Sequence, residues 1–211
     1  NTTFQNAHGL DEETQNYSTA HDMALLSSYV YKNFKKYRTI TKTYKYQVQT
    51  KEKSYLWYNR NKLLKSYEYC TGGKNGYTPS AGKTLVTTAS KDGLNLTVVT
   101  LKDGNEYNTH KELYELMFNK YKSYKLIDKD NFNIDDKKLK DKVYINKSFT
   151  YPLTEEEKNH IEIKTKVDTN IKKGKIGYIS IKLYNKEIGN IKIYLKEKKS
   201  QKKKLFGSLN R

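Results

Sequence analysis

Cysteine is almost absent from this sequence. The one cysteine, Cys70, excludes an intramolecular disulfide. We interpret it as a small, buried apolar residue rather than a reactive thiol. No apolar run is long enough to span a bilayer, and no signal peptide begins at Asn1. Because the first residues are polar and loop-like, we expect the sequence to start inside a longer protein.

Arginine is also scarce, although the chain is strongly basic. Lysine and arginine total 41 against 23 acidic residues, a formal net charge of +18, yet the arginines are only Arg38, Arg60 and Arg211. Such a charge indicates an anionic partner: nucleic acid, acidic lipid or an acidic surface polymer. Nucleic-acid readers rely on arginine, so the lysine bias argues against nucleic acid. A compositional bias of the genome toward Lys, Asn, Tyr and Ile is the alternative explanation for part of the charge.

Common catalytic and cofactor signatures are missing. No histidine pair has metal-ligand spacing, and no nucleophile elbow, Walker or dinucleotide glycine pattern occurs. The acidic cluster Glu155–Glu157 follows Thr154 and is typical of a charged first helical turn. The sequence therefore predicts no metal and no cofactor. The scattered histidines are His8, His21, His110 and His160.

Residues 1–124 have an α+β pattern. Alternating and β-branched segments predict strands, and Lys91-Asp92-Gly93 predicts a hairpin turn between two of them. Thr19 with Asp22, and Thr109 with Glu112, fit capping boxes that open two helices, the first ending near Phe34. The predicted strands are 43–49, 82–89 and 94–101. The apolar stripes that we expect in the core are Met23, Leu26, Val30 and Phe34 in the first helix, and Leu113, Leu116, Met117 and Tyr121 in the second.

The pattern changes after residue 124. Residues 125–142 are charged, and short alternating strands with Gly turns follow from Val143. This spacing predicts a small β-sandwich over 125–197. The tail from Lys198 to Arg211 is dense in lysine, and we interpret it either as a frayed end or as an anchor to an anionic membrane surface. The expected turn glycines are Gly174, Gly177 and Gly189.

One segment, Gly72-Gly73-Lys74-Asn75-Gly76-Tyr77-Thr78, leads directly into the strand 82–89. It allows two interpretations. Lys74-Asn75-Gly76 could be an ordinary exposed Asn-Gly turn. It could instead be the Lys-Thr-Gly element of serine penicillin-recognising enzymes, with Asn in place of Thr.

The surrounding motifs favour the second interpretation. Residues 72–79 resemble the GGKTGYT-type box of D-alanyl-D-alanine carboxypeptidases, the low-molecular-weight penicillin-binding proteins. Four more segments resemble the same family, in the family's order. They are FQNAHGL (4–10), YSTAHDMA (17–24), NRNKLL (59–64) and AGKTLV (81–86). The β module after residue 124 resembles the C-terminal sandwich of these proteins.

The resemblance implies a serine peptidase that trims the stem peptides of peptidoglycan and reacts with β-lactams. It implies part of a penicillin-binding antiparallel sheet with helices. Lys74 and the backbone N–H of Tyr77, an oxyanion donor, would be catalytic. Asn75, Gly76 and Thr78 would bind substrate. The protein would act outside the cell, in the wall or at the outer face of the membrane.

Two departures from the family pattern matter. The S-x-x-K and S-x-N boxes, which carry the nucleophile, are expected upstream of Asn1, and Asn75 stands where the family has threonine. We therefore expect the chain alone to be inactive and to pair with the missing segment or with itself. The alternative is a non-catalytic protein that binds the cell wall or surface anions.

Overall fold

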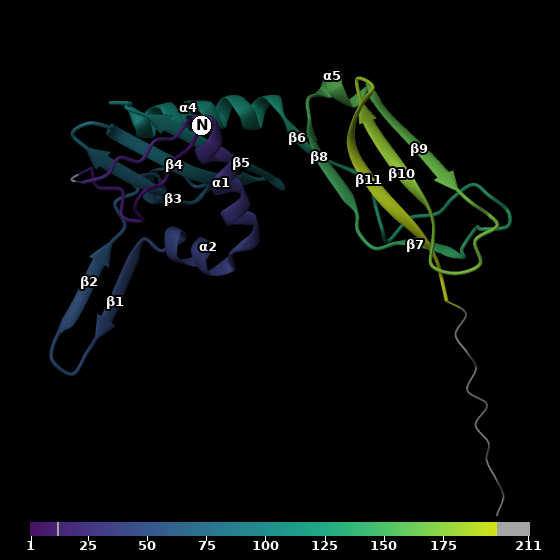
Figure 1. Cartoon of the computed structure of the whole chain (residues 1–211), viewed down its shortest axis with the longest axis horizontal. Coiled ribbons are helices and arrows are strands. Elements are labelled where there is room, and N and C mark those ends of the chain that lie inside the picture. Colours follow the sequence, from purple (N-terminus) through teal and green to yellow (C-terminus); the bar gives the residue numbers. More distant parts are fainter. Residues whose placement is uncertain (12, 198–211) are drawn as a thin grey trace, which may run out of the picture. The chain divides into compact units, whose positions relative to one another are not determined.

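The computed structural model describes residues 1–11 and 13–197. The chain divides into two compact units, unit 1 (residues 1–123) and unit 2 (residues 124–211). Both contain antiparallel sheets, and helices accompany the sheet of unit 1 (Figure 1). The predicted α+β fold class is confirmed.

The centre of unit 1 is a three-stranded antiparallel sheet in the order β3-β4-β5. Its strands are β3 (Cys70–Thr78), β4 (Gly82–Lys91) and β5 (Leu94–Leu101). The predicted hairpin between the last two is confirmed: Asp92 and Gly93 join β4 to β5 with φ values of 49° and 78°. Positive φ at both turn residues matches the right-handed twist of paired strands, which is why Asp-Gly is favoured here.

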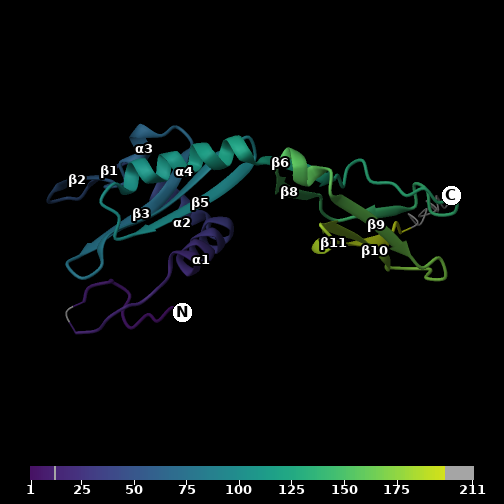
Figure 2. The same ribbon diagram turned by 90° about the horizontal axis from the view of Figure 1, so that it is seen from above.

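Helices cover both faces of this sheet. α4 (Glu106–Lys120) packs on β4 and β5, while α1 (Ala20–Asn33) and α2 (Lys35–Lys42) lie on the opposite side (Figure 2). The short helix α3 (Leu63–Ser66) adjoins β3. Between α2 and α3, the hairpin of β1 (Lys45–Gln49) and β2 (Ser54–Tyr58) forms a separate two-stranded sheet.

The face that α1 turns toward the sheet differs from the prediction. Thr19 caps the helix as expected, since its hydroxyl accepts a 3.0 Å hydrogen bond from the backbone N–H of Asp22. However, the buried residue of α1 is Ser27, and the Ser28 hydroxyl lies 3.0 Å from that of Thr97 on β5. The expected core stripe is wrong. Leu26 and Phe34 are exposed, and Met23 and Val30 are only partly buried.

The second predicted helix is also rotated and begins earlier. α4 starts at Glu106 after Asn105, so Thr109 lies inside the helix rather than at its cap. Its buried residues are His110, Tyr114 and Phe118, whereas Leu116 is exposed. The physical reason is aromatic stacking. The Tyr114 ring lies 5.5 Å from that of Tyr67 and 6.0 Å from that of Phe118, nearly parallel to both.

Unit 2 contains two sheets around one apolar core. The larger has the strand order β7-β11-β10-β9, and the smaller pairs β6 with β8. Ile179, Ile181, Ile191 and Ile193 are almost fully buried, and Leu126 of β6 and Phe149 of β8 pack against this core. This is the predicted sandwich. The strands are β6 (Lys122–Ile127), β7 (Val143–Ile145), β8 (Phe149–Leu153), β9 (Ile161–Val167), β10 (Lys175–Leu183) and β11 (Lys186–Leu195).

Two of the predicted turn glycines lie inside strands of unit 2. Gly177 pairs with Val167 and Ile193, and Gly189 pairs with Ile181. A Cβ on Gly177 would lie 2.0 Å from the Lys166 carbonyl oxygen, so close strand approach explains this glycine. The turn between β10 and β11 is instead Tyr184-Asn185, with φ values of 47° and 66°. The predicted charged helical turn is confirmed as α5 (Glu155–Lys158), which has a complete capping box.

No helix among the described residues is long and apolar enough to cross a membrane. The predicted membrane anchor, Lys198 to Arg211, lies outside the described residues.

Candidate active-site edge

The Lys74 segment is an edge strand. β3 pairs with β4 on one side only, and among residues 1–11 and 13–197 no strand pairs with its other edge. Lys74 is opposite Val86, and Gly76 is opposite Thr84. The interpretation of Lys74-Asn75-Gly76 as an exposed Asn-Gly turn is therefore wrong. The turn lies later, between Thr78 and Gly82.

The predicted site residues divide between the two faces of β3. Because side chains alternate along a strand, Lys74 and Thr78 project from the same face as the Gly76 position, and Asn75 and Tyr77 from the other. Lys74 and Tyr77 are exposed, the latter by 69%. The Lys74 ammonium donates a hydrogen bond to the backbone carbonyl of Asn75. Among the described residues it makes no ion pair.

Three glycines of β3 allow this strand to lie close to α2 and β4. A Cβ on Gly73, which has φ +147°, would lie 2.2 Å from the carbonyl oxygen of Val86. One on Gly72 would lie 2.5 Å from the Thr41 hydroxyl of α2, and one on Gly76 would lie 2.8 Å from that of Thr84. Each glycine thus permits an approach that a larger residue would prevent. At Gly76 the crowding comes from the neighbouring strand.

The N-terminal loop contacts the end of the same strand. The Ser80 hydroxyl donates to the carboxylate of Asp11, and the hydroxyls of Thr78 and Ser80 are 3.3 Å apart. Hydrogen bonding from Ser80 and Thr78 lowers the pKa of Asp11. Sequence reasoning missed Asp11. Its one signal is its position directly after the FQNAHGL motif, whose loop it connects to the β3–β4 turn.

Polar side chains just before α3 connect this part of the chain to β3 and α2. Asn61 is fully buried; its side-chain oxygen accepts from the Leu63 backbone N–H at 3.1 Å, and its amide lies 3.8 Å from the Cys70 sulfur. Asn59 donates to the carbonyls of Thr41 and Thr43, each at 3.2 Å. The two asparagines of the NRNKLL motif thus hold the chain around α3. Cys70 is buried as predicted, and burial raises the pKa of its thiol.

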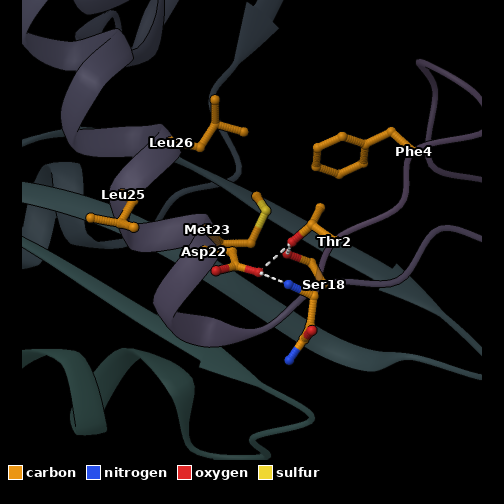
Figure 3. A pocket seen from close by; sticks show the side chains of 8 residues that line it. Thr2, Phe4, Ser18, Asp22, Met23, Leu25 and Leu26 are labelled. Carbon is orange, nitrogen blue, oxygen red and sulfur yellow. Dashed lines mark hydrogen bonds and ion pairs between the residues drawn. The ribbon is translucent and has the colours of Figure 1, made fainter.

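A shallow groove of about 410 Å³ lies between the N-terminal loop and α1 (Figure 3). Phe4, Leu25 and Leu26 form its apolar part, while the Asp22 carboxylate accepts a 2.7 Å hydrogen bond from Thr2. That hydrogen bond is the main reason why the pKa of Asp22 is lowered. The groove includes none of the residues of β3.

No cluster of three or more His, Cys, Asp or Glu residues suited to a metal exists among the described residues. His8 and His160 lie outside the helices and strands, His21 lies in α1 and His110 in α4. His110 is the buried one, between Thr87 and Thr100.

The chain is similar to known proteins of one family. The sequence profile of the D-alanyl-D-alanine carboxypeptidase family matches residues 1–105. D-alanyl-D-alanine carboxypeptidase DacF of Bacillus subtilis (strain 168) is 34% identical over 135 residues, 60% of this chain and 33% of the relative. Penicillin-binding protein 5 from Haemophilus influenzae aligns with a TM-score of 0.65 at 20% identity, over 92% of this chain and 60% of that chain. The D-alanyl-D-alanine carboxypeptidase of Mycobacterium tuberculosis H37Rv aligns with a TM-score of 0.51 at 26% identity, over 56% of this chain and 47% of that chain.

The family match, together with the shared fold, therefore places the chain in the low-molecular-weight penicillin-binding class. The chain belongs to the D-alanyl-D-alanine carboxypeptidase family, and residues 1–105 carry that membership. It spans about a third of the length of the curated relative that it matches.

Proposed function

We propose that the full-length protein is a serine D-alanyl-D-alanine carboxypeptidase that trims peptidoglycan stem peptides. The supporting observation is the edge strand β3, which carries an exposed lysine without an ion pair among the described residues. An open strand edge can accept an extended peptide through main-chain hydrogen bonds. A cation beside that edge recognises a peptide that ends in a carboxylate.

The reaction in this proposal has two steps. A serine hydroxyl loses its proton to a base and attacks the carbonyl between the two terminal D-alanines. The C–N bond breaks, and D-alanine leaves as the protonated amine. Water then hydrolyses the ester and restores the serine. Lys74 holds the terminal carboxylate, and the Tyr77 backbone N–H donates to the developing oxyanion. Loss of such a donor typically costs about 3 kcal/mol of transition-state stabilisation.

Asn75 and Thr78 complete the substrate edge in this proposal. Asn75 replaces the hydroxyl of a threonine with a longer amide that reaches the carboxylate from another direction. We expect weakened carboxylate recognition rather than none. In this proposal Gly76 adds no side chain that would crowd the peptide backbone, and Thr78 is held at the strand end by contact with Ser80.

The nucleophile comes from a segment outside this chain. Residues 1–124 are then the C-terminal portion of the penicillin-binding domain, and 125–197 form its accessory β-sandwich. The exposed apolar face of α1 supports this arrangement, because Leu25, Leu26 and Tyr29 point away from the sheet, and Leu25 is 59% exposed. Contiguous apolar surface of this kind is typical of an interface. Without the missing segment, we expect this face to cause self-association.

The proposal places the protein outside the cell, in the wall or at the outer membrane face, where its substrate and β-lactams are found. The basic tail Lys198–Arg211 would then contact anionic lipid, at roughly 1 kcal/mol per lysine near the surface. No nucleic-acid role is included.

The test is release of D-alanine from a peptide ending in D-Ala-D-Ala by the full-length product. We expect Lys74→Ala to lower kcat/KM at least tenfold through loss of the carboxylate contact. The matched control is Lys192→Ala, an exposed strand lysine of unit 2, which should leave kcat/KM unchanged. We expect Asn75→Thr to raise turnover. Equal activity of Lys74→Ala and the unsubstituted protein would overturn the proposal.

A second candidate, a non-catalytic protein that binds wall or surface anions, is favoured by one observation, the net charge of +18. It predicts salt-sensitive binding to anionic polymers that Lys74→Ala does not change. A full-length product that binds such polymers but releases no D-alanine would favour it.

A further inference from the structure

The hairpin of β1 and β2 has an aromatic face that the site described above does not use. Tyr46 is directly opposite Trp57, and Val48 is opposite Tyr55, so these four side chains share one face. The rings of Tyr46 and Trp57 lie 6.1 Å apart with an interplanar angle of 9°. Those of Trp57 and Tyr55 lie 5.3 Å apart at 18°. Trp57 is thus the centre of a row of three nearly parallel rings.

This row remains open to solvent. Tyr46 is 58% and Trp57 52% exposed. β1 and β2 form a sheet of their own, and they project away from the β3-β4-β5 sheet of unit 1 (Figure 1). Cross-strand ring pairs stabilise a hairpin, but stacking between the rings leaves more than half of these two side chains uncovered. Tyrosine and tryptophan exposed together in this way are the residues that most often anchor a binding partner.

Positive charge surrounds the aromatic row. Residues 45–60 contain four basic residues and one acidic residue, a net charge of +3. The Lys53 ammonium lies 5.3 Å from the centroid of the Tyr55 ring, directly beside the row. The positive charge favours an anionic partner, and the exposed aromatic rings favour a partner with flat apolar faces. The basic residues are Lys45, Lys51, Lys53 and Arg60, and the acidic one is Glu52.

The arrangement of the tip argues against insertion into a bilayer. The hairpin ends in Thr50-Lys51-Glu52-Lys53, closed by a 2.9 Å hydrogen bond from the Thr50 N–H to the Lys53 carbonyl. The aromatic rings lie behind this charged tip, on the face of the hairpin. They therefore suit an extended polymer that lies along the face. The C–H groups of sugar rings pack on aromatic rings, and carboxylates on the same chain can pair with the lysines.

We propose that the β1–β2 hairpin binds an acidic polysaccharide, with sugar rings on Tyr46, Trp57 and Tyr55 and acid groups on Lys51 and Lys53. This surface is separate from the Lys74 edge. If binding of the polysaccharide were disproved, the proposed carboxypeptidase function would still stand. If the carboxypeptidase function were disproved, the proposed polysaccharide binding would still stand.

Trp57 is the only tryptophan in the chain, so its fluorescence reports on this face directly. The probes are oligosaccharides of alternating glucuronate and N-acetylglucosamine, neutral N-acetylglucosamine oligomers, and polyglutamate. We expect saturable fluorescence changes with the acidic sugar, weaker ones with the neutral sugar, and none with polyglutamate, which has charge but no sugar rings. No change with either sugar would overturn the proposal.

Two pairs of variants separate the rings from the charge. Tyr46→Ala should weaken acidic-sugar binding by about tenfold, as for an aromatic interface anchor, whereas Tyr46→Phe should bind normally. Lys51→Gln with Lys53→Gln keeps all the rings, and should weaken binding of the acidic sugar but not of the neutral one. The control Tyr29→Ala removes a similarly exposed tyrosine from α1 and should change the binding of neither the acidic nor the neutral sugar.

Other partners give different results. A blue shift of Trp57 fluorescence with phosphatidylglycerol vesicles, without any response to sugar, would overturn the proposal in favour of a membrane surface. Concentration-dependent sedimentation that Tyr46→Ala abolishes, again without sugar binding, would instead assign the face to a second copy of the chain. Unchanged sugar binding in both Tyr46→Ala and the double lysine variant would also contradict it.

Discussion

The hydroxyl of Thr87 on β4 lies 2.7 Å from Nδ1 of His110 on α4, inside the core of unit 1. His110 is fully buried, and its Nε2 lies 3.1 Å from the Thr100 hydroxyl. Burial lowers the pKa of His110 to about 4, although the charge of Asp103 opposes part of this effect. The folded protein therefore holds this histidine in its neutral form.

A pH dependence of stability follows. Because the pKa of His110 is lower in the folded state than in the unfolded state, the unfolded chain takes up the proton first as the pH falls. The neutral, buried His110 therefore contributes fully to the free energy of unfolding above about pH 6.5. This contribution falls by up to about 3 kcal/mol as the pH drops from about 6.5 to about 4. Urea unfolding of unit 1 at pH 7.5 and 4.5 measures it.

Carboxylates also titrate in this range, so the informative quantity is the difference between variants. His110→Gln should lose stability at pH 7.5 but show a smaller decline toward pH 4.5. His160→Gln removes an exposed histidine of unit 2 and should leave the decline unchanged. An equal decline in His110→Gln and the unsubstituted chain would show that His110 does not contribute.

Gly73→Ala should disrupt the pairing of β3 with β4. The added Cβ would lie 2.2 Å from the carbonyl oxygen of Val86 and 2.8 Å from the Cα of Thr87, at a backbone φ of +147°. Since both contacts are with backbone, they cannot be relieved by a rotamer change. We expect a loss of roughly 2–5 kcal/mol in the free energy of unfolding. Gly104→Ala, whose Cβ meets nothing within 4 Å, is the control and should change little. A near-normal Gly73→Ala would mean that the strand does not lie as described.

Ile181→Ala should destabilise unit 2. Ile181 is fully buried in the core between the sheets, so the substitution leaves a cavity that typically costs about 2–5 kcal/mol. The control is Ile163→Ala, directly opposite on β9 but 45% exposed, for which we expect a much smaller loss. Thermal or urea unfolding monitored by amide exchange in residues 143–195 distinguishes the two. Equal losses of stability in the two variants would mean that Ile181 does not lie in the core of unit 2.

Much of unit 1 could be predicted because its signals are local. Asp92-Gly93 favours a tight hairpin through its own backbone preferences, and the family motifs favoured the Lys-Thr-Gly interpretation of Lys74–Gly76 over an exposed turn. Thr19 identified the first turn of α1 through its own hydroxyl. Such features depend on residues close in sequence, and the sequence alone is enough to place them.

The helix faces could not be predicted in the same way. Apolarity favoured Leu116 over His110, yet the sheet presents the hydroxyls of Thr87 and Thr100, which satisfy a buried histidine. On α1, Ser27 and Ser28 face the sheet and the leucines face outward. Which face of a helix is buried depends on the surface that packs against it. The sequence pattern of the helix alone carries no information about that surface.

The most direct test of the central proposal is to locate the serine that a β-lactam acylates. The full-length product and the 211-residue chain are each incubated with benzylpenicillin, digested and analysed by mass spectrometry. The account predicts one acylated serine in the full-length product, outside residues 1–211, and no adduct on the shorter chain. An adduct on any serine of residues 1–211, or a full-length product that forms none, would contradict it.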